Sequence, residues 1–494
     1  MLFDTGFTTI HVQPRSGILA LFLCLLFQIA QGQGFAVSQQ SNCAMARAGT
    51  GVAYSCGDAS GVFYNPATVG EHSETGDFVL TIGLDGGFQN RGFDADYASF
   101  DDLREFPNTG ANNDQRRLSP TFPHVYASYQ ATPKLTAGIG AYAPYSLHTR
   151  WPEAWHGAFD GDDTMIRAFY IQPTVAYEIT DRIRIGGGPI FGTSDVEFSR
   201  LLDLSPQPVR SPDLPTGTTY GSVGIPFHTP FADAAFEATG ETAWGGHIGA
   251  TVRVTDFLQV GARYLLPMTF AYDGEARFAQ VPTGIVLPAE NSVTGVETLV
   301  DDLVRDRFAD GGTFVKQAME TTIEFPAQFA AGVVYTTAIA DNTFRILADY
   351  QWTGWSRLNE ITLQFDRLSD EVRPLRYTNT STLRLGVEYA EGLRAGYSFS
   401  TMAVPDETAT PFFPGGDQHR ATLGYSVFLT EFLSIDGAIQ YTFLGERRGN
   451  LRSPLSSKKG SGPGFMGGTF GGLSTFENER AIGFGAGLTV SLHL

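Results

Sequence analysis

The sequence of 494 residues predicts an all-β fold, a transmembrane antiparallel β-barrel of about fourteen strands with an N-terminal hatch, or plug, inside its lumen. Three observations predict it: apolar and polar residues alternate over long segments, short and long connections alternate along the chain, and the composition is rich in glycine and aromatic residues. The chain has 57 Gly, 38 Phe and 19 Tyr, and only 17% of its residues are charged. This composition is typical of barrels with tight turns and aromatic girdles.

The alternating segments predict strands that have one apolar and one polar face. The segment 432–443 is an example, with apolar residues at Leu433, Ile435, Ile439, Tyr441 and Phe443 and polar residues at Ser434, Asp436, Gln440 and Thr442. Segments 344–355 and 382–390 alternate in the same way. Outside the first thirty or so residues, no apolar run reaches the length of about 18 residues that a transmembrane helix needs.

The connections assign the two ends of the barrel. Short turns are expected at 132–134, 180–181, 255–256, 341–342, 391–392 and 430–431, and long Pro- and Gly-rich loops near 91–120, 149–164, 200–239, 273–320, 357–377, 403–416 and 446–479. Between them we expect strands at 77–90, 121–131, 133–148, 165–180, 182–199, 240–255, 257–272, 322–338, 342–356, 378–390, 391–402, 417–430, 431–445 and 480–494. Tight periplasmic turns and long external loops are typical of bacterial outer-membrane barrels. A soluble β-sandwich, the alternative, rarely needs strands and loops of this length.

The charge and the motifs exclude several functional classes. The formal net charge is −19, so nucleic acid is not an expected partner. The chain has neither G-x-S-x-G nor H-E-x-x-H, and its nine histidines are scattered, so we expect no enzyme, no metal site and no cofactor.

The first 32 residues are expected to be a signal peptide. The apolar run 18–30 follows Arg15, and the small residues Ala30 and Gly32 place the cleavage after Gly32. An uncleaved membrane anchor is the alternative. The mature chain then divides into a hatch at 33–76 and a barrel at 77–494. A fourteen-stranded barrel has a lumen too wide for wall side chains to fill, so the segment before the first strand could fold inside it.

Two cysteines remain in the mature chain. Cys43 and Cys56 are thirteen positions apart in an exported protein, so we expect one disulfide between them, two free thiols being the alternative.

Several segments, in order along the chain, are similar to one known family. They include Gly34-Phe35, "RAGTGVAYSCGDASGVFYNPA" at 47–67, "GIGAYAPYSLHTRWPEAWHG" at 138–157, "IQPTVAYEITDRIRIGGG" at 171–188, "IEFPAQFAAGVVY", "LADYQWTGWSRL", and 394–426 with Pro405-Asp406. Together they resemble the FadL family of outer-membrane transporters for long-chain fatty acids and other hydrophobic compounds. The chain departs from the usual pattern in lacking a terminal aromatic residue and in carrying the two hatch cysteines.

The resemblance implies passive uptake through the bacterial outer membrane. Substrate would be captured among the external loops and released sideways into the membrane through a gap where strand three, 133–148, kinks inward, while the hatch blocks the lumen. The resemblance also implies a monomer whose partners are the hydrophobic substrate, outer-membrane lipid and lipopolysaccharide. A general porin and a barrel-anchored surface receptor remain alternatives.

Two short motifs are candidates for the gap itself. Gly138, Gly140 and Pro144 interrupt strand three, because glycine weakens a strand and proline cannot donate to the ladder; a bulge without function is the alternative. The tripeptide Asn65-Pro66-Ala67 ends the hatch. We expect it to dock on the lumen side of the bend and hold the gap open, the alternative being an ordinary turn.

The external loops contain candidate residues for substrate capture. They are Leu201, Leu202, Phe227, Phe231, Leu299, Leu303 and Phe308. Apolar residues at helical spacing predict an amphipathic helix over 296–308, which either lines a groove or packs on the rim. Three cations, Arg305, Arg307 and Lys316, lie nearby. They either bind an acidic ligand or form a solvated charged face. The basic loop 446–479 either contacts lipopolysaccharide through Arg447, Arg448, Lys458 and Lys459 or is only flexible.

Overall fold

The computed structural model describes residues 35–71, 76–92, 94–96, 114–120, 123–151, 156–159, 161–210, 214–226, 228–339, 341–390, 392–408, 416–445, 447–452, 473–478 and 481–494. The expected signal peptide, Phe227, Lys458 and Lys459 therefore lie outside the described residues, as do the side chains of Arg447 and Arg448. No described helix is long and apolar enough to cross a membrane.

The wall is a closed antiparallel barrel of 14 strands, which confirms the predicted fold. Several strands are broken into two pieces, and the pieces are named separately. In order around the wall they are β1 (Phe78–Gly92), β3 (Asp114–Pro120) with β4 (His124–Thr132), β5 (Leu135–Arg150), β6 (Asp163–Thr180), β7 (Ile183–Asp203), β8 (Pro230–Gly240) with β9 (Ala243–Thr255), β10 (Leu258–Leu265) with β11 (Met268–Gln280), β14 (Gln317–Phe325) with β15 (Gln328–Ile339), β16 (Asn342–Thr353) with β17 (Glu360–Phe365), β18 (Glu371–Pro374) with β19 (Thr380–Tyr389), β20 (Leu393–Ser400), β21 (Gln418–Thr430), β22 (Leu433–Leu444) and β25 (Ala481–His493). The barrel closes where β1 pairs with β25, with Ile82 opposite Val490.

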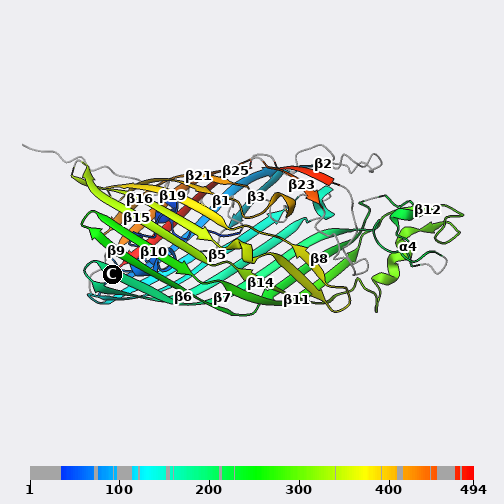
Figure 1. Ribbon diagram of the computed structural model, residues 1–494, viewed down its shortest axis with the longest axis horizontal. Helices are drawn as coiled ribbons and strands as arrows, with labels where there is room; N and C mark the ends of the chain where they lie inside the picture. Colours follow the sequence, from blue (N-terminus) through cyan, green and yellow to red (C-terminus); the bar gives the residue numbers. More distant parts are fainter. Residues whose placement is uncertain are drawn as a thin grey trace, which may run out of the picture.

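Shorter elements lie in the connections and in the N-terminal segment. The strands among them are β2 (Asp94–Asp96), β12 (Val286–Leu287), β13 (Thr298–Leu299), β23 (Arg447–Arg452) and β24 (Leu473–Asn478). The α-helices are α2 (Asn42–Ala46), α3 (Gly61–Tyr64) and α4 (Val300–Val304), and the 3-10 turns are η1 (Pro66–Thr68), η2 (His156–Phe159), η3 (Gly221–Val223), η4 (Arg305–Arg307), η5 (Trp355–Arg357) and η6 (Asp406–Thr408). In Figure 1 the C-terminus and the short turns lie at one end of the barrel, and α4 and β12 project from the other.

The two faces of the wall follow the alternation in the sequence. On β22, Ile439 and Tyr441 are exposed on the outer surface, whereas Gln440 and Thr442 are buried in the interior. The outward face is therefore apolar and suits lipid, as barrels of this kind require.

The strands continue further into the external loops than the alternation predicts. The expected loops 200–239 and 273–320 contain β8 and the outer ends of β11 and β14. There Phe236 of β8 lies between Phe198 of β7 and Ala276 of β11 and is buried. Beyond the lipid, apolar side chains pack against one another instead of facing outward, so the apolar-outward pattern that marks a membrane strand is lost.

Residues 35–71, here called the N-terminal segment, lie within the barrel. Helix α2 packs against β20, β21, β22 and β25, whereas η1 packs against β6, β7 and β9. Figure 1 shows this blue segment enclosed by the strands. The segment therefore contacts inner surfaces on different sides of the wall.

Candidate functional site

Strand β5 contains a bend at Ala143 and Pro144. Its ladder with β4 ends at Ala141, which is opposite Val125. Its ladder with β6 shifts register between Tyr142 and Tyr145, so the two residues Ala143 and Pro144 lie opposite the single residue Phe169 of β6. Proline at this position fits a bulge, because it has no N–H to give to a ladder.

Gly138 and Gly140 lie below the bend, in the fully paired part of β5. They are opposite Ser128 and Tyr126 of β4, so the expectation that they interrupt the pairing is wrong. A Cβ on Gly138 would lie 3.1 Å from Val69 Cγ1, and one on Gly140 would lie 2.9 Å from Val62 Cγ1. These glycines let the N-terminal segment approach the wall closely.

The start of the N-terminal segment supplies hydrogen bonds to the bend from the lumen side. The Val37 amide donates to the Pro144 carbonyl at 2.7 Å, and the Ser146 amide donates to the Phe35 carbonyl at 2.9 Å. The Gln40 side-chain amide donates to the Ala143 carbonyl at 2.7 Å. Backbone groups at a wall irregularity need such partners because an unsatisfied group near lipid costs several kcal/mol.

An aromatic cluster lies beside these hydrogen bonds. The Phe35 ring packs edge-on against Trp355 at 4.6 Å and against Phe325 at 5.4 Å between ring centroids, and Tyr145 packs against Phe325 at 4.9 Å. All four side chains are buried. Tyr145 therefore points inward onto Phe325 of β14 and Trp355 of η5.

The Tyr145 hydroxyl also reaches the break between β14 and β15. It donates to the Pro326 carbonyl at 2.9 Å and accepts from the Gln328 side-chain amide at 3.0 Å. The bend in β5 and a break in a distant strand are thus joined through one side chain.

A cationic group is linked to the aromatic cluster through Gln328, which hydrogen-bonds both Arg263 and the Tyr145 hydroxyl. Arg263 on β10 is 4% exposed, and its Nη2 donates to Gln328 Oε1 at 3.0 Å and to Gln351 Oε1 at 3.1 Å. Its Nε and Nη1 have no hydrogen-bond partner among the described residues, and neither does Nε2 of buried His247. Burying polar groups without partners costs free energy, so a polar group, from water or from a ligand, would stabilise these donors.

Asn65-Pro66-Ala67 does not dock at the bend, which corrects our expectation. The Asn65 side-chain amide donates to the Val52 carbonyl at 2.6 Å and to the Ala250 carbonyl of β9 at 3.2 Å. The Ala67 carbonyl accepts from Arg184 Nε on β7 at 3.1 Å. The tripeptide lies against Gly186 and Gly249, where a Cβ would come within 2.4 Å of Pro66 and 1.9 Å of Asn65. The glycines of β7 and β9 allow this approach, so the motif fits those strands and not β5.

Polar contacts also attach the N-terminal segment to the wall. Arg47 forms an ion pair with Glu388 of β19 at 3.2 Å, and the amides of Gly51 and Val52 donate to Asp349 Oδ2 at 2.8 and 3.1 Å. Burial lowers the pKa of the Arg47 guanidinium, and the Glu388 carboxylate opposes this.

Glu71 ends the described part of the segment. It accepts from the Gln259 side-chain amide at 2.6 Å, and its Oε2 is buried without a partner among the described residues. Burial of the carboxylate raises the pKa of Glu71, and the Gln259 hydrogen bond opposes this.

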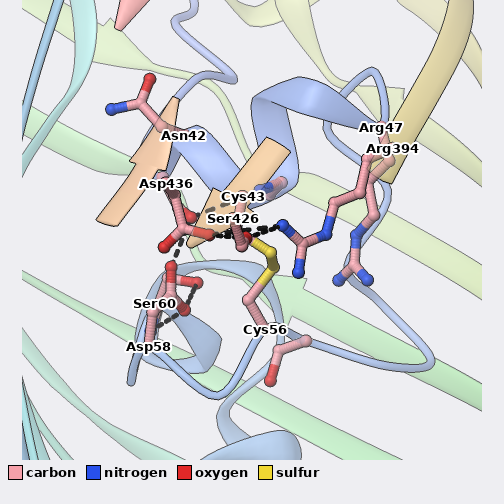
Figure 2. The surroundings of a disulfide bond; sticks show 12 residues. Asn42, Cys43, Arg47, Cys56, Asp58, Ser60, Arg394, Ser426 and Asp436 are labelled. Atoms are coloured by element: carbon pink, nitrogen blue, oxygen red, sulfur yellow. Dashed lines mark hydrogen bonds and ion pairs between the residues drawn. A yellow bond between two sulfur atoms is a disulfide. The ribbon is translucent and has the colours of Figure 1, made fainter. Parts of the chain in front are cut away.

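A disulfide closes a loop within the segment. Cys43 of α2 and Cys56 are joined with a Cα–Cα distance of 6.3 Å, and Figure 2 shows the bridge and its surroundings. By chain entropy alone, a loop of this length contributes about 2–3 kcal/mol to stability.

The expected capture residues are distributed around an apolar layer in the external loops. Phe231 is fully buried, with its ring 6.1 Å from that of Phe308 and 5.3 Å from that of Phe314. Leu202 is buried beside them, whereas Leu201, Leu303 and Phe308 are partly buried against the same core. Leu299 is partly exposed in β13. These residues therefore pack into one apolar core in the external loops.

The expected helix over 296–308 is only partly formed. The structure has α4 at Val300–Val304 followed by the 3-10 turn η4 at Arg305–Arg307, and Val296 is exposed. Arg307 is buried, donating to Gln207 Oε1 at 3.2 Å and to the Pro208 carbonyl at 2.5 Å, and burial lowers its pKa. It therefore joins two loops, which the sequence pattern did not indicate.

Phe35, Tyr145 and Arg263 are the central residues that sequence reasoning missed as site residues. Arg263 had one available signal, because it is a cation at an inward position of a strand predicted to cross the membrane. Phe35 and Tyr145 offered none, since their contacts join segments remote in the chain.

The chain was compared with known proteins. A family model described as outer membrane protein transport protein (OMPP1/FadL/TodX) matches residues 23–467. A FadL homologue from Pseudomonas aeruginosa is 20% identical, with a TM-score of 0.70 over 93% of this chain and 99% of that one. The toluene transporter TodX from P. putida is 16% identical, with a TM-score of 0.59 over 94% and 99% of the two chains. The toluene transporter TbuX from Ralstonia pickettii is 17% identical, with a TM-score of 0.56 over 92% and 99%. No curated protein matches the chain in sequence.

Proposed function

The chain belongs to the outer-membrane protein transport family (OMPP1/FadL/TodX), whose model spans most of its length, and from this we propose that it takes up long-chain fatty acids or similar hydrophobic compounds passively and releases them sideways at the bend of β5. Members of the family are transport channels of the bacterial outer membrane for hydrophobic compounds, not enzymes. The proposal concerns the substrate and the exit.

The bend at Ala143 and Pro144 carries the proposal for the exit. Its backbone is hydrogen-bonded from the lumen by Phe35 and Val37, at the start of the N-terminal segment. A few residues outside the ladders of the barrel can move aside at less cost than a wall strand. An apolar substrate that displaces them would lie next to the lipid and avoid re-exposure to water, which costs about 0.8 kcal/mol for each methylene.

Arg263 supports a substrate with an acidic head group. Its guanidinium, with two unpartnered donors, shares Gln328 with the Tyr145 hydroxyl of the aromatic cluster and lies 5.6 Å from the Phe63 ring. A carboxylate at Arg263 would leave the acyl chain among the aromatic rings. Charge-assisted hydrogen bonds of this kind are about twice as strong as neutral ones.

A deletion of Pro144 tests the exit. It leaves Ala143 opposite Phe169 and brings Tyr142 and Tyr145 into one continuous register with β6, so we expect uptake of radiolabelled oleate by cells to fall severalfold at equal levels of folded barrel. The control is the double substitution A143S/P144S, which keeps two bulged residues and should keep most of the uptake. Full uptake by the deletion variant would refute lateral release at this bend.

We extend the proposal to a monomer in contact with outer-membrane lipid. The apolar outer face exemplified by Ile439 and Tyr441 supports contact with lipid. Native mass spectrometry of the purified protein would report its mass together with any co-purified fatty acid or lipopolysaccharide. A dimer mass that survives delipidation would contradict the monomer.

A further inference from the structure

The Cys43–Cys56 disulfide lies where a reagent from one end of the barrel can reach one of its two cysteines. Cys43 is 2% exposed. Cys56 is partly exposed and lines a cavity of about 590 Å³. Residues of the short-turn end, Glu431, Phe432 and Leu494, line the same cavity, so it opens on the periplasmic side. The two sulfur atoms therefore differ in their access to reagent.

The cavity carries charges of both signs. Arg345 and Arg394 line it together with Glu71, Asp77, Glu388 and Glu431. Glu388 is paired with both arginines, at 2.7 Å in each case. With two arginines against four carboxylates, the lining offers no excess of cations that would attract an anionic reagent. What it offers is a path to one sulfur atom.

We propose that Cys56 is a thiol-exchange site through which a periplasmic dithiol opens the bridge in the folded protein. A thiolate of the dithiol attacks Sγ of Cys56, the Cys43–Cys56 bond breaks, and Sγ of Cys43 leaves and takes up a proton. The second thiol of the reagent then attacks the mixed disulfide and releases Cys56. In total two electrons and two protons pass to the cysteine pair, and the dithiol becomes a disulfide.

Opening the bridge frees a short stretch and leaves its surroundings in place. Helix α2 stays attached because the Asn42 side-chain amide donates to Thr489 Oγ1 at 2.9 Å and Arg47 pairs with Glu388. On the other side, Asp58 accepts from the hydroxyls of Ser41 and Ser60, each at 2.5 Å. The stretch between these anchors that lines the cavity is 54–57. The bridge thus links the mobility of this part of the segment to the thiol state of the periplasm.

Trapping with a monothiol tests which sulfur is attacked. The folded full-length protein in detergent is incubated with glutathione, quenched with acid, and mapped by mass spectrometry. We expect the mixed disulfide on Cys56 to exceed that on Cys43 by about ten-fold. Equal labelling of both cysteines would overturn the proposal. A bridge that opens only as fast as the whole protein unfolds in denaturant would also overturn it.

A steric variant tests the route through the cavity. Gly57 is exposed, and a Cβ there meets nothing within 4 Å, so Gly57→Phe should fold normally and hinder approach to Cys56. We expect reduction by dithiothreitol to slow by about ten-fold, whereas Gly445→Phe, an equally open glycine outside the N-terminal segment, should leave the rate unchanged. Equal rates in the two variants would contradict access through this cavity.

Hydrogen exchange reports the consequence for the segment. After reduction by dithiothreitol we expect faster exchange at 54–57, with α2 unchanged. A parallel experiment uses a thioredoxin-type protein dithiol as the reductant. If dithiothreitol reduces the bridge and the protein dithiol does not, the reagent is a small dithiol. Unchanged exchange at 54–57 after complete reduction would show that the bridge does not control this stretch.

Discussion

Arg263 is an unusual residue for the interior of a barrel, because part of its guanidinium lacks a partner in the described structure. Its two hydrogen bonds go to neutral side-chain amides of Gln328 and Gln351. The guanidinium carbon lies over the Phe63 ring, 5.6 Å from its centroid. A buried cation whose direct hydrogen bonds all go to neutral groups is well placed to bind an anion that arrives from outside.

Arg263→Gln should therefore discriminate between substrates. We expect uptake of oleate to fall by about ten-fold, the equivalent of one lost charge-assisted hydrogen bond, whereas uptake of toluene stays within about twofold. Parallel uptake assays with the two labelled substrates measure this. The control is Arg253→Gln, at an exposed arginine of β9. If both substrates are affected alike, Arg263 supports the wall and not the head group.

Glu71 should make the end of the N-terminal segment sensitive to pH. Its pKa is raised in the folded protein, so folding favours the protonated form. This contribution to stability is present below the ordinary glutamate pKa and is lost as the pH rises through the folded value. We expect hydrogen exchange at 68–71 to accelerate, beyond its intrinsic pH dependence, as the pH is raised, and Glu71→Gln to abolish this extra acceleration. An identical pH profile in the variant would assign the effect to another group.

At the scale of elements, the alternation predicted the strands well because the membrane imposes it. A strand between lipid and a polar lumen must place apolar residues on one face only, as Ile439 and Tyr441 show against Gln440 and Thr442. Where lipid no longer covers the wall, as at Phe236, this constraint ends and the predicted boundaries were wrong. The strand pattern thus identifies the part of each strand that faces lipid.

The docking of Asn65-Pro66-Ala67 could not be predicted from the motif alone. Its position depends on which inward wall residues lack a side chain, namely Gly186 and Gly249. A glycine run at 186–188 was visible in the sequence, but many strands contain glycine, and only the folded arrangement brings β7 and β9 to the same tripeptide.

Gly186→Ala should loosen the N-terminal segment. The new methyl group would lie 2.4 Å from backbone atoms of Pro66 and 2.6 Å from the Ala67 amide, so the segment must shift as a unit. We expect cells with this variant to become severalfold more permeable to a large antibiotic, at unchanged barrel levels. Gly437→Ala on β22 is the matched control, because its nearest contact is at 4.0 Å. Equal permeability in the two variants would show that the wall tolerates the methyl group.

For the whole molecule, the closed barrel followed from composition and periodicity, but its interior did not. The contacts of Phe35 with Trp355 and of Tyr145 with Pro326 join segments roughly two to three hundred residues apart in the chain. Such contacts depend on the shape of the closed wall, which local patterns do not describe. The transport route is thus the least predictable part of the molecule from its sequence.

The intact barrel should behave as a closed pore. Within the N-terminal segment, residues 41–71 should block conductance, whereas residues 35–40 should affect only the exit at the bend. Residues 41–71 hold most of the contacts with the wall, including Asn42 to Thr489 and Arg47 to Glu388, whereas residues 35–40 contact the bend. A fourteen-stranded barrel without the segment would have a water-filled lumen.

In planar bilayers we expect little conductance from the intact protein and from a variant lacking 35–40. A variant lacking 35–71 should conduct at least about ten-fold more. The deletion of 35–40 should still lower oleate uptake, since it removes the groups that form hydrogen bonds with the backbone at the bend. An intact protein that conducts as well as the variant lacking 35–71 would identify a general porin and exclude a closed lumen.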